Sequence, residues 1–385
     1  MMACVNTRNL LYVITYDPNN PKVEVVQSSV AITEFHKSDK DFFYIQFSDP
    51  SSFRIVDVKG LIPEEEFEQI KDPNSNLHLM LDNALEFYLL SADTIYEEIV
   101  IKHGVPAEKI IFLSAIPTMH EYIKKLSEKY KLPEIKLEWF NLFEHTGRNA
   151  RLLSKDVETL NKKQSYERSF LCLNRRWRMH RPLMFTLLKD RGLVDKGFIS
   201  LAPSDDGMDW NKVFPRLRLM YQNHALIDPI LERNSDVINT PPLYLDLEDL
   251  VTNRAEPEVS INEYYKKTYF SLINETTYHE NVPFFSEKIF KAIGMGHPFL
   301  VATAANSLQY LRKLGYKTFH PFIDESYDNI SDDGKRMLAI VDEAKRLCNL
   351  DKAEFKSWRA SVEPIVRHNQ RLIESKRSIS QRMNY

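Results

Sequence analysis

Cysteine and glycine are both scarce in this chain. Three cysteines occur in 385 residues, Cys4, Cys172 and Cys348, and they lie far apart. An odd, scattered set argues against a disulfide framework and for reduced thiols in a cytoplasmic setting, and Cys172, inside an apolar run, is expected in the core. The ten glycines form no Walker or GxGxxG loop, so a bound phosphate would have to be held by charged side chains and helix ends.

Long apolar runs and a large net charge are also missing. No apolar segment approaches the ~20 residues that span a membrane, and the N-terminus has no signal-peptide pattern, so we expect a cytoplasmic protein without a membrane span. The net charge of −3 gives no overall basic field that would attract nucleic acid. There is one local basic block, because residues 151–181 hold nine Lys/Arg against three Asp/Glu.

What is present is an alternation of strand-like and helix-like segments. With 43% hydrophobic residues, 22 Phe and 18 Tyr, the chain can fill two cores of ordinary size. Apolar runs bounded by turn residues predict strands, and amphipathic stretches followed by Gly predict helices. We expect an opening meander of strands at 10–16, 42–47 and 53–58. A β–α–β–α–β rhythm over about 77–140 then predicts a parallel, doubly wound sheet, with strands at 77–81, 109–114 and 135–140 and helices at 93–103 and 117–130.

The polar, charged segment 144–168 marks the expected domain boundary. We predict an N-terminal α/β domain over 1–150, a C-terminal α/β domain over 151–355, and a C-terminal helix over 356–385 that crosses back to the first domain. The elements expected in the second domain are strands at 169–173, 197–201, 269–273, 299–302 and 317–322, and helices at 183–191, 286–294, 307–314 and from 332 to about 375.

The stretch 265–299 carries the strongest signal for function. A short apolar strand ends in Asn274 and Glu275, and Ser286 is a good N-cap for a helix whose first turn holds Glu287 and Lys288. Backbone N–H groups are free at a helix start and the helix dipole is positive there, so an anion is stabilised. The alternative is that Glu287 only completes the helix start and Lys288 is solvated.

These residues resemble the donor-binding motif of GT-B glycosyltransferases of the fucosyltransferase and exostosin type. That motif reads as an aromatic strand ending in "EN", then "TEK", a helix, "G" and "PV". The resemblance implies two Rossmann-like domains facing across a cleft, with Glu287 on the nucleotide ribose and Lys288 on the diphosphate. Donor-binding roles for Asn274, Glu275 and Ser286 follow in the same way, although here Asn and Glu are in reverse order and Ser replaces Thr.

Two further groups of residues follow predicted strands. Arg175 and Arg176 come after the strand at 169–173, and in the resembled family a basic residue at this place contacts the donor pyrophosphate; the alternative is a solvated basic loop. Asp82 and Glu86 follow the strand at 77–81, where ligands gather in open α/β sheets. They are our candidates for the catalytic base, together with His145, although Asp82 could simply cap a helix.

The resulting hypothesis is an inverting, metal-independent glycosyltransferase whose donor is a nucleoside-diphosphate sugar and which needs no other cofactor. The segments SEKIFKAIGMGHPF and LNRRWRMHRP are similar to those of phage and marine-microbe glycosyltransferase-like proteins. Hydroxymethylated pyrimidine in double-stranded phage DNA is therefore one acceptor to consider, and a saccharide or lipopolysaccharide is equally compatible. A different class of function, a non-catalytic nucleic-acid-binding protein, would use the 151–181 block with Trp177 stacked on a base.

Overall fold

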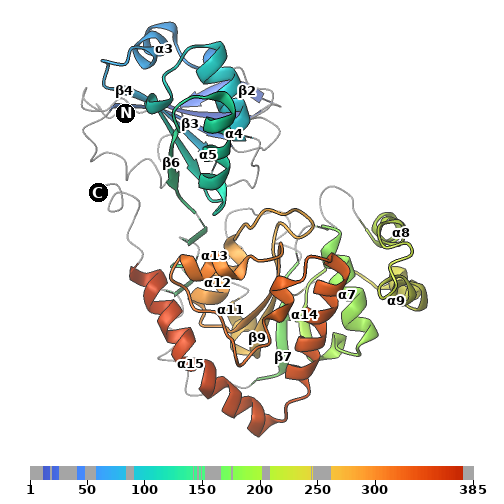
Figure 1. Ribbon diagram of the computed structural model, residues 1–385. Helices are drawn as coiled ribbons and strands as arrows, with labels where there is room; N and C mark the ends of the chain where they lie inside the picture. The colour runs from blue at the N-terminus through green and yellow to red at the C-terminus, as the bar shows by residue number, and fades with distance from the viewer. Residues whose placement is uncertain are drawn as a thin grey trace. The chain divides into compact units, whose positions relative to one another are not determined.

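The computed structural model describes residues 12–17, 20–25, 41–47, 58–83, 91–141, 143–144, 147–148, 150–151, 166–174, 177–201, 209–243, 245 and 262–375. Contacts along the chain separate two compact units, the first within residues 1–142 and the second within residues 143–375 (Figure 1). The division falls a few residues before the predicted boundary at 150. The strands of the second unit's sheet are parallel and those of the first unit's sheet are parallel except for one edge strand, so the predicted α/β class is confirmed.

The first unit is built on a six-stranded sheet with the order β2-β1-β3-β4-β5-β6. Its elements are β1 (Tyr12–Asp17), β2 (Asn20–Val25), β3 (Asp41–Phe47), η1 (Val58–Leu61), α3 (Glu64–Lys71), β4 (Leu77–Asn83), α4 (Ser91–Thr94), η2 (Ile95–Lys102), η3 (Ala107–Lys109), β5 (Ile110–Ser114), α5 (Met119–Tyr130) and β6 (Lys136–Trp139). β4 lies between β3 and β5 and is buried along its whole length, as expected of a central parallel strand.

The prediction of an opening meander is wrong, because β3 pairs with β1 in parallel. Only two residues separate β1 from β2, so these two strands form an antiparallel hairpin, whereas the longer connection to β3 allows a parallel crossover. The parallel strands β4 to β6 were predicted correctly, whereas β3 was predicted as part of the meander and pairs with β4 in parallel. The order of β3 to β6 runs in one direction, and among the described strands of this unit the order changes direction at β1, which has β2 on one side and β3 on the other. The strand predicted at 53–58 lies outside the described residues except for Val58, which starts η1.

The second unit has a four-stranded parallel sheet with the order β10-β9-β7-β8. Its elements are β7 (Arg168–Cys172), α7 (His180–Asp190), η5 (Val194–Lys196), β8 (Gly197–Ile199), α8 (Trp210–Met220), α9 (Asp228–Arg233), η6 (Ser235–Asn239), α11 (Asn262–Lys266), β9 (Thr268–Asn274), α12 (Glu287–Gly294), β10 (Phe299–Ala302), α13 (Leu308–Lys313), η8 (Ser326–Asn329), α14 (Asp333–Cys348) and α15 (Lys352–Ser375).

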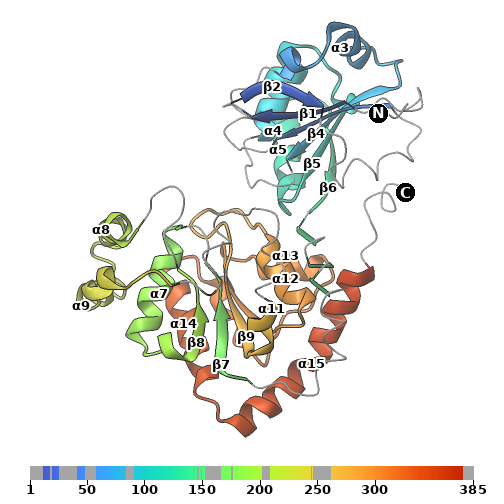
Figure 2. The ribbon, with the colours of Figure 1, turned by 180° about the vertical axis from the view of Figure 1, so that it is seen from behind.

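Helices cover both faces of this second sheet. α14 packs against α7 and β7 on one side, and α12 packs against β9 and α15 on the other (Figures 1 and 2). The chain leaves β7 to form β8 on one side and later returns to form β9 on the other, so the strand order reverses between β7 and β9. In open α/β sheets, ligands bind at the carboxyl ends of the strands beside such a reversal.

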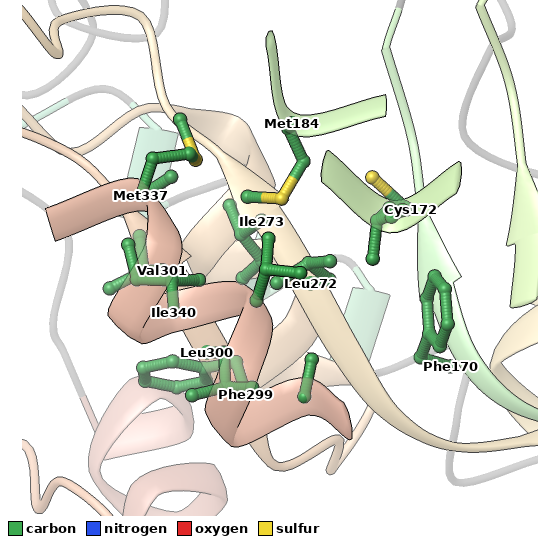
Figure 3. Close-up of a cluster of buried hydrophobic side chains, with 14 of the residues drawn as sticks. Phe170, Cys172, Met184, Leu272, Ile273, Phe299, Leu300, Val301, Met337 and Ile340 are labelled. Carbon is green, nitrogen blue, oxygen red and sulfur yellow. The ribbon is translucent and has the colours of Figure 1, made fainter. Parts of the chain in front are cut away.

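The core of the second unit fills the space between sheet and helices. Figure 3 shows Phe170 and Cys172 of β7, Leu272 and Ile273 of β9 and Leu300 of β10 meeting side chains of α7 and α14. The Cys172 thiol is 1% exposed, which confirms its predicted place in the core, and burial raises its pKa to about 11. A thiol in that state is a packing group and not a nucleophile.

One element of the second unit was predicted wrongly. Residues 317–322 form no strand, although Phe319 is buried as the apolar pattern requires. The backbone of Lys317 bonds instead to the Asn369 side chain of α15, which accepts from Lys317 N at 2.8 Å and donates to Lys317 O at 2.8 Å. Because a distant side chain satisfies these groups, they take no part in a ladder with β10.

Candidate functional site

The carboxyl ends of β7 and β9 are joined by a pair of buried asparagines. Asn274 Nδ2 donates to Asn174 Oδ1 at 2.9 Å, and Asn174 Nδ2 donates to the Ser200 carbonyl at 3.1 Å. Both side chains are almost fully buried, at 0% and 4% exposure. Asn274 therefore connects the ends of the two strands where the strand order reverses, and its amide fixes the positions from which the following loops start.

Glu275 connects the end of β9 to the start of α12. Its carboxylate accepts from Ser286 N at 3.2 Å and from the Ser286 hydroxyl, and its own backbone N–H donates to Ala302 O at 2.9 Å. Burial raises the pKa of this fully buried carboxyl, while the Lys288 charge and the Ser286 hydrogen bonds oppose that rise. Glu275 thus anchors the loop between β9 and α12, because its two oxygens hold the residue that caps the helix.

The first turn of α12 presents the predicted acidic and basic pair. Ser286 is the N-cap, as predicted, and its hydroxyl accepts from the Lys288 backbone. Lys288 Nζ donates to Glu287 Oε1 and to Ser286 Oγ, each at 2.9 Å. The Glu287 side chain is 44% exposed and that of Lys288 is 20% exposed. Burial acts to raise the pKa of Glu287, but Lys288 outweighs it and the pKa lies below its usual range.

The start of α7 brings a second set of cationic and aromatic groups to the same place. Arg181 donates from Nη2 to Asn274 O at 3.4 Å, and His180 Nε2 donates to Glu275 O at 2.9 Å. Burial and the nearby Arg178 lower the pKa of Arg181 to about 10, against the charges of Glu287 and Glu275. Arg181 therefore stays protonated at neutral pH, and its charge acts on the same small region as Glu287.

Among the described residues, three helices of eight residues or more start at this edge of the second unit: α7, α12 and α14. The contacts of His180 with the Glu275 carbonyl and of Tyr278 OH with the Asp333 carbonyl, at 2.6 Å, tie the three starts to the loop after β9. Free N–H groups and positive dipole ends add to the charges of Arg181 and Lys288. The arrangement can bind a doubly charged phosphate ester, with carboxylates beside it for hydroxyl groups.

The predicted site residues fall into three groups. Asn274, Glu275, Ser286, Glu287 and Lys288 are brought together as described, Asn274 and Glu275 as buried supports. Arg175, Arg176, Glu86 and His145 lie outside the described residues. Asp82 is at the end of β4 in the first unit, where its side chain is 2% exposed.

The sequence interpretation passed over several residues of this site. Asn174, His279 and Asp333 were not singled out, and Arg181 was noted only as part of the 151–181 block. Trp177 is a correction: it is 7% exposed and packs edge to face on Trp210 at 5.0 Å. A buried indole cannot stack on a base, so the nucleic-acid-binding hypothesis loses its aromatic platform. Trp177 follows the end of the predicted strand 169–173 by four residues, and this position in the sequence does not indicate that its side chain is buried.

Within the described residues, no helix is both long and apolar enough to cross a membrane. The same residues contain no cluster of three His, Cys, Asp or Glu side chains that could hold a metal ion.

Comparison with known proteins gives only remote structural matches. No protein-family model and no curated protein sequence matches the chain. A UDP-forming α,α-trehalose-phosphate synthase from Burkholderia xenovorans aligns with a TM-score of 0.45 and 9% identity, over 91% of this chain and 75% of that one. An α,α-trehalose 6-phosphate synthase from Burkholderia multivorans gives 0.44 and 9% (87% and 68% coverage), and the trehalose-6-phosphate synthase OtsA gives 0.41 and 10% (97% and 99%). At these scores the matches carry no argument about this chain, and the α/β class rests on its own sheets.

Proposed function

We propose that this protein is a glycosyltransferase that moves a sugar from a nucleoside-diphosphate donor to a hydroxyl acceptor. One observation carries the proposal: Arg181, Glu287 and Lys288 meet beside the β7–β9 order reversal, at the starts of α7 and α12. In this reading, the Glu287 carboxylate accepts from the ribose hydroxyls. Arg181 and Lys288 bind the diphosphate, each as a charge-assisted hydrogen-bond donor. The two units would then act in the GT-B manner, with the donor on the second unit.

The chemistry follows from the leaving group. The acceptor oxygen attacks the anomeric carbon, the bond from that carbon to the diphosphate oxygen breaks, and its electron pair leaves with the diphosphate. The charge that grows there is stabilised by fixed cations and helix starts, which need no reorganisation during the step. We propose that these groups, without a metal ion, suffice. In an inverting displacement a base removes the acceptor proton, and Asp82 or Glu86 of the first unit is our candidate.

We propose hydroxymethylated pyrimidine in DNA as the first acceptor to test. The support is the resemblance to phage glycosyltransferases together with the basic block at 151–181, whose Lys/Arg would contact DNA phosphates and make binding steeply salt-dependent. The target base would have to leave the stack to reach an anomeric carbon. Saccharide and lipopolysaccharide acceptors are the alternatives.

A donor screen tests the central proposal. Thermal melting with UDP, GDP, UDP-glucose, UDP-N-acetylglucosamine and GDP-mannose should show stabilisation by one diphosphate and its sugar, and the same shift in the presence of EDTA. Stabilisation of about 3 kcal/mol is expected at a hundredfold excess over the dissociation constant. Absence of any response to every nucleotide would reject the donor site and the transferase with it.

A transfer assay then tests the acceptor and the base. Radiolabelled sugar from the selected donor is offered to hydroxymethylated DNA, plain DNA and glycans, and the product's anomeric configuration is read by NMR. Incorporation into hydroxymethylated DNA alone supports the DNA proposal, and incorporation only into glycans rejects it. Asp82→Asn should lower transfer while leaving donor binding unchanged, and retention of full turnover would remove Asp82 as the base.

A further inference from the structure

A second polar cluster lies at the start of α14, next to the proposed diphosphate site. His279 Nδ1 lies 2.7 Å from Asp333 Oδ2, and the other oxygen of Asp333 accepts from Arg336 Nη2. Arg336 is 2% exposed and also donates to the carbonyls of Tyr278 at 2.8 Å and Thr303 at 3.2 Å. The buried Arg336 guanidinium therefore connects the loop after β9, the loop after β10 and the start of α14. The His279 imidazole contacts this group through Asp333.

The hydrogen-bonding state of this imidazole follows from its partner. The pKa of Asp333 lies below its usual range, because the His279 and Arg336 contacts outweigh the effect of burial, so the carboxylate is ionised and can only accept. The Nδ1 atom of His279 must then carry a proton in either protonation state of the ring. In the neutral ring, the Nε2 atom is consequently a hydrogen-bond acceptor.

That acceptor atom has no partner. Nε2 of His279 is buried and forms no hydrogen bond with any described residue, and the same holds for the hydroxyls of Thr277 and Thr303 in the adjoining loops. A buried polar atom without a partner costs about 1–3 kcal/mol, so each such atom requires an explanation. The His279 side chain as a whole is still 22% exposed, so the ring lies at the rim of the site and not in the core.

The His180 and His279 rings connect this cluster to the residues proposed to bind the diphosphate. The His180 ring lies 6.0 Å from that of His279, and its Nε2 donates to the carbonyl of Glu275, the residue that holds the start of α12. The sequence of contacts therefore runs from Glu287 and Lys288 on α12, through the start of α7, to His279 in the loop after β9. A nucleotide sugar with its ribose at Glu287 and its diphosphate at Arg181 would direct its sugar toward His279.

We propose that His279 Nε2 accepts a hydrogen bond from a hydroxyl group of the transferred sugar, with Asp333 as the residue that fixes its tautomer. This proposal rests on the proposed function. With the ring neutral, the chemistry selects a hydroxyl and not a phosphate, because an acceptor atom pairs with a ligand that donates and a phosphate diester oxygen does not. Thr277 and Thr303 can serve further hydroxyls of the same sugar, since each hydroxyl both donates and accepts.

The test compares a nucleoside diphosphate with its nucleotide sugar, for example UDP with UDP-glucose or GDP with GDP-mannose, by isothermal titration calorimetry. In His279→Ala, affinity for the diphosphate should be unchanged, and affinity for the nucleotide sugar should fall about three- to tenfold. His279→Gln, which can present an amide oxygen near the Nε2 position, should recover part of the loss. A donor lacking the contacted hydroxyl should bind the wild type and His279→Ala equally.

Asp333→Asn is the second variant. Because Arg336 donates to one carboxylate oxygen, the new amide would keep its oxygen there and donate from nitrogen to His279 Nδ1. That moves the ring proton to Nε2 and turns the acceptor into a donor, so sugar affinity should fall at least as far as in His279→Ala. The matched control is His224→Ala, because His224 Nε2 bonds Asp332 Oδ1 at 3.1 Å, a second His–Asp pair at the same helix start. It should change neither affinity.

The outcomes separate the two proposals. Wild-type protein that binds no nucleotide overturns the donor site itself. Equal losses for diphosphate and nucleotide sugar in His279→Ala would assign His279 to the diphosphate or ribose and overturn the sugar contact. Unchanged affinity for both ligands would also overturn it. Melting temperatures of all variants within a few degrees of the wild type show that any loss comes from binding and not from unfolding.

Discussion

Replacing Lys288 with Ala should separate binding from stability. In the free protein the Lys288 ammonium contacts Glu287, whose side chain is 44% exposed, and the Ser286 hydroxyl. Ion pairs this exposed contribute about 0–1 kcal/mol, so the free energy of unfolding should fall by less than about 1 kcal/mol. A charge-assisted bond to a diphosphate is worth about 1.5–3 kcal/mol, so the dissociation constant should rise about 10- to 150-fold.

Two measurements on the same samples decide this. Calorimetric titration with the diphosphate selected in the donor screen gives the affinity, and urea unfolding gives the stability. Lys345→Ala is the matched control, because Lys345 is an exposed lysine on α14 with its position in the last turn, away from the helix starts. Glu287→Ala should also lose donor affinity by about tenfold through the ribose hydroxyls. Wild-type affinity in both Lys288→Ala and Glu287→Ala would refute the assignment of α12 to the donor.

Three other substitutions test the framework of the second unit, and Gly104→Ala in the first unit serves as a comparison for one of them. Gly294→Ala places a Cβ 2.1 Å from the Gly147 carbonyl oxygen, so overpacking should cost about 1–3 kcal/mol or more in urea unfolding; Gly104→Ala, at φ +72° with open space around it, should cost only about 1–2 kcal/mol of backbone strain. Ser286→Ala removes the α12 cap and a donor to buried Glu275, for a loss of about 2–4 kcal/mol; a loss under ~0.5 kcal/mol would contradict the cap. Burial raises the pKa of Asp328 to about 6 although it accepts from Ser307 N and Leu308 N. Its neutral form is therefore favoured in the fold, so the wild type should lose up to about 3 kcal/mol of stability as pH rises from 4 to 7, and Asp328→Asn should lack that loss; parallel pH profiles would contradict it.

Local patterns were sufficient for much of the fold. Ser286, with Glu287 and Lys288 after it, predicted the start of α12 correctly, because a cap and its helix are adjacent in sequence. The strands β3 to β6 were also found, since each is a short apolar run between turn signals, and the parallel arrangement was predicted for β4 to β6. The strand expected at 317–322 failed because Asn369, fifty-two residues away, takes the backbone groups a strand would need.

The site itself depends on contacts that no local pattern contains. Arg181 reaches Asn274 across ninety-three residues, and His279 reaches Asp333 across fifty-four. Both contacts join loops and helix starts that are far apart in the sequence, and which of them meet depends on the order of the strands in the sheet. The basic block at 151–181 predicted an anion site, which stays a prediction, and only long-range contacts distinguish Trp177, which packs on Trp210, from Arg181, which donates to Asn274 O.

The order Asn274–Glu275, reversed relative to the resembled motif, has a physical account. Neighbouring residues at a strand end point in opposite directions, so Asn274 turns to Asn174, which follows β7, and Glu275 turns to Ser286, the N-cap of α12. Glu275 is then a positioning residue for Lys288. The Ser286 hydroxyl already accepts from Lys288 N and Nζ while it donates to Glu275.

Glu275→Gln tests this account. The new amide nitrogen would compete for the Ser286 lone pairs and displace the Lys288 ammonium, so affinity for the diphosphate should fall several-fold although Glu275 contacts no ligand. Burial raises the pKa of Glu275, so the wild type should also lose stability as pH rises above the ordinary glutamate range, and the Gln variant should not. If Glu275 acts through Lys288, the double variant Glu275→Gln/Lys288→Ala should bind the diphosphate no worse than Lys288→Ala alone. Additive losses would mean that Glu275 affects donor binding independently of Lys288. The hydrogen bonds from Glu275 to Ser286 would then not be what positions the Lys288 ammonium.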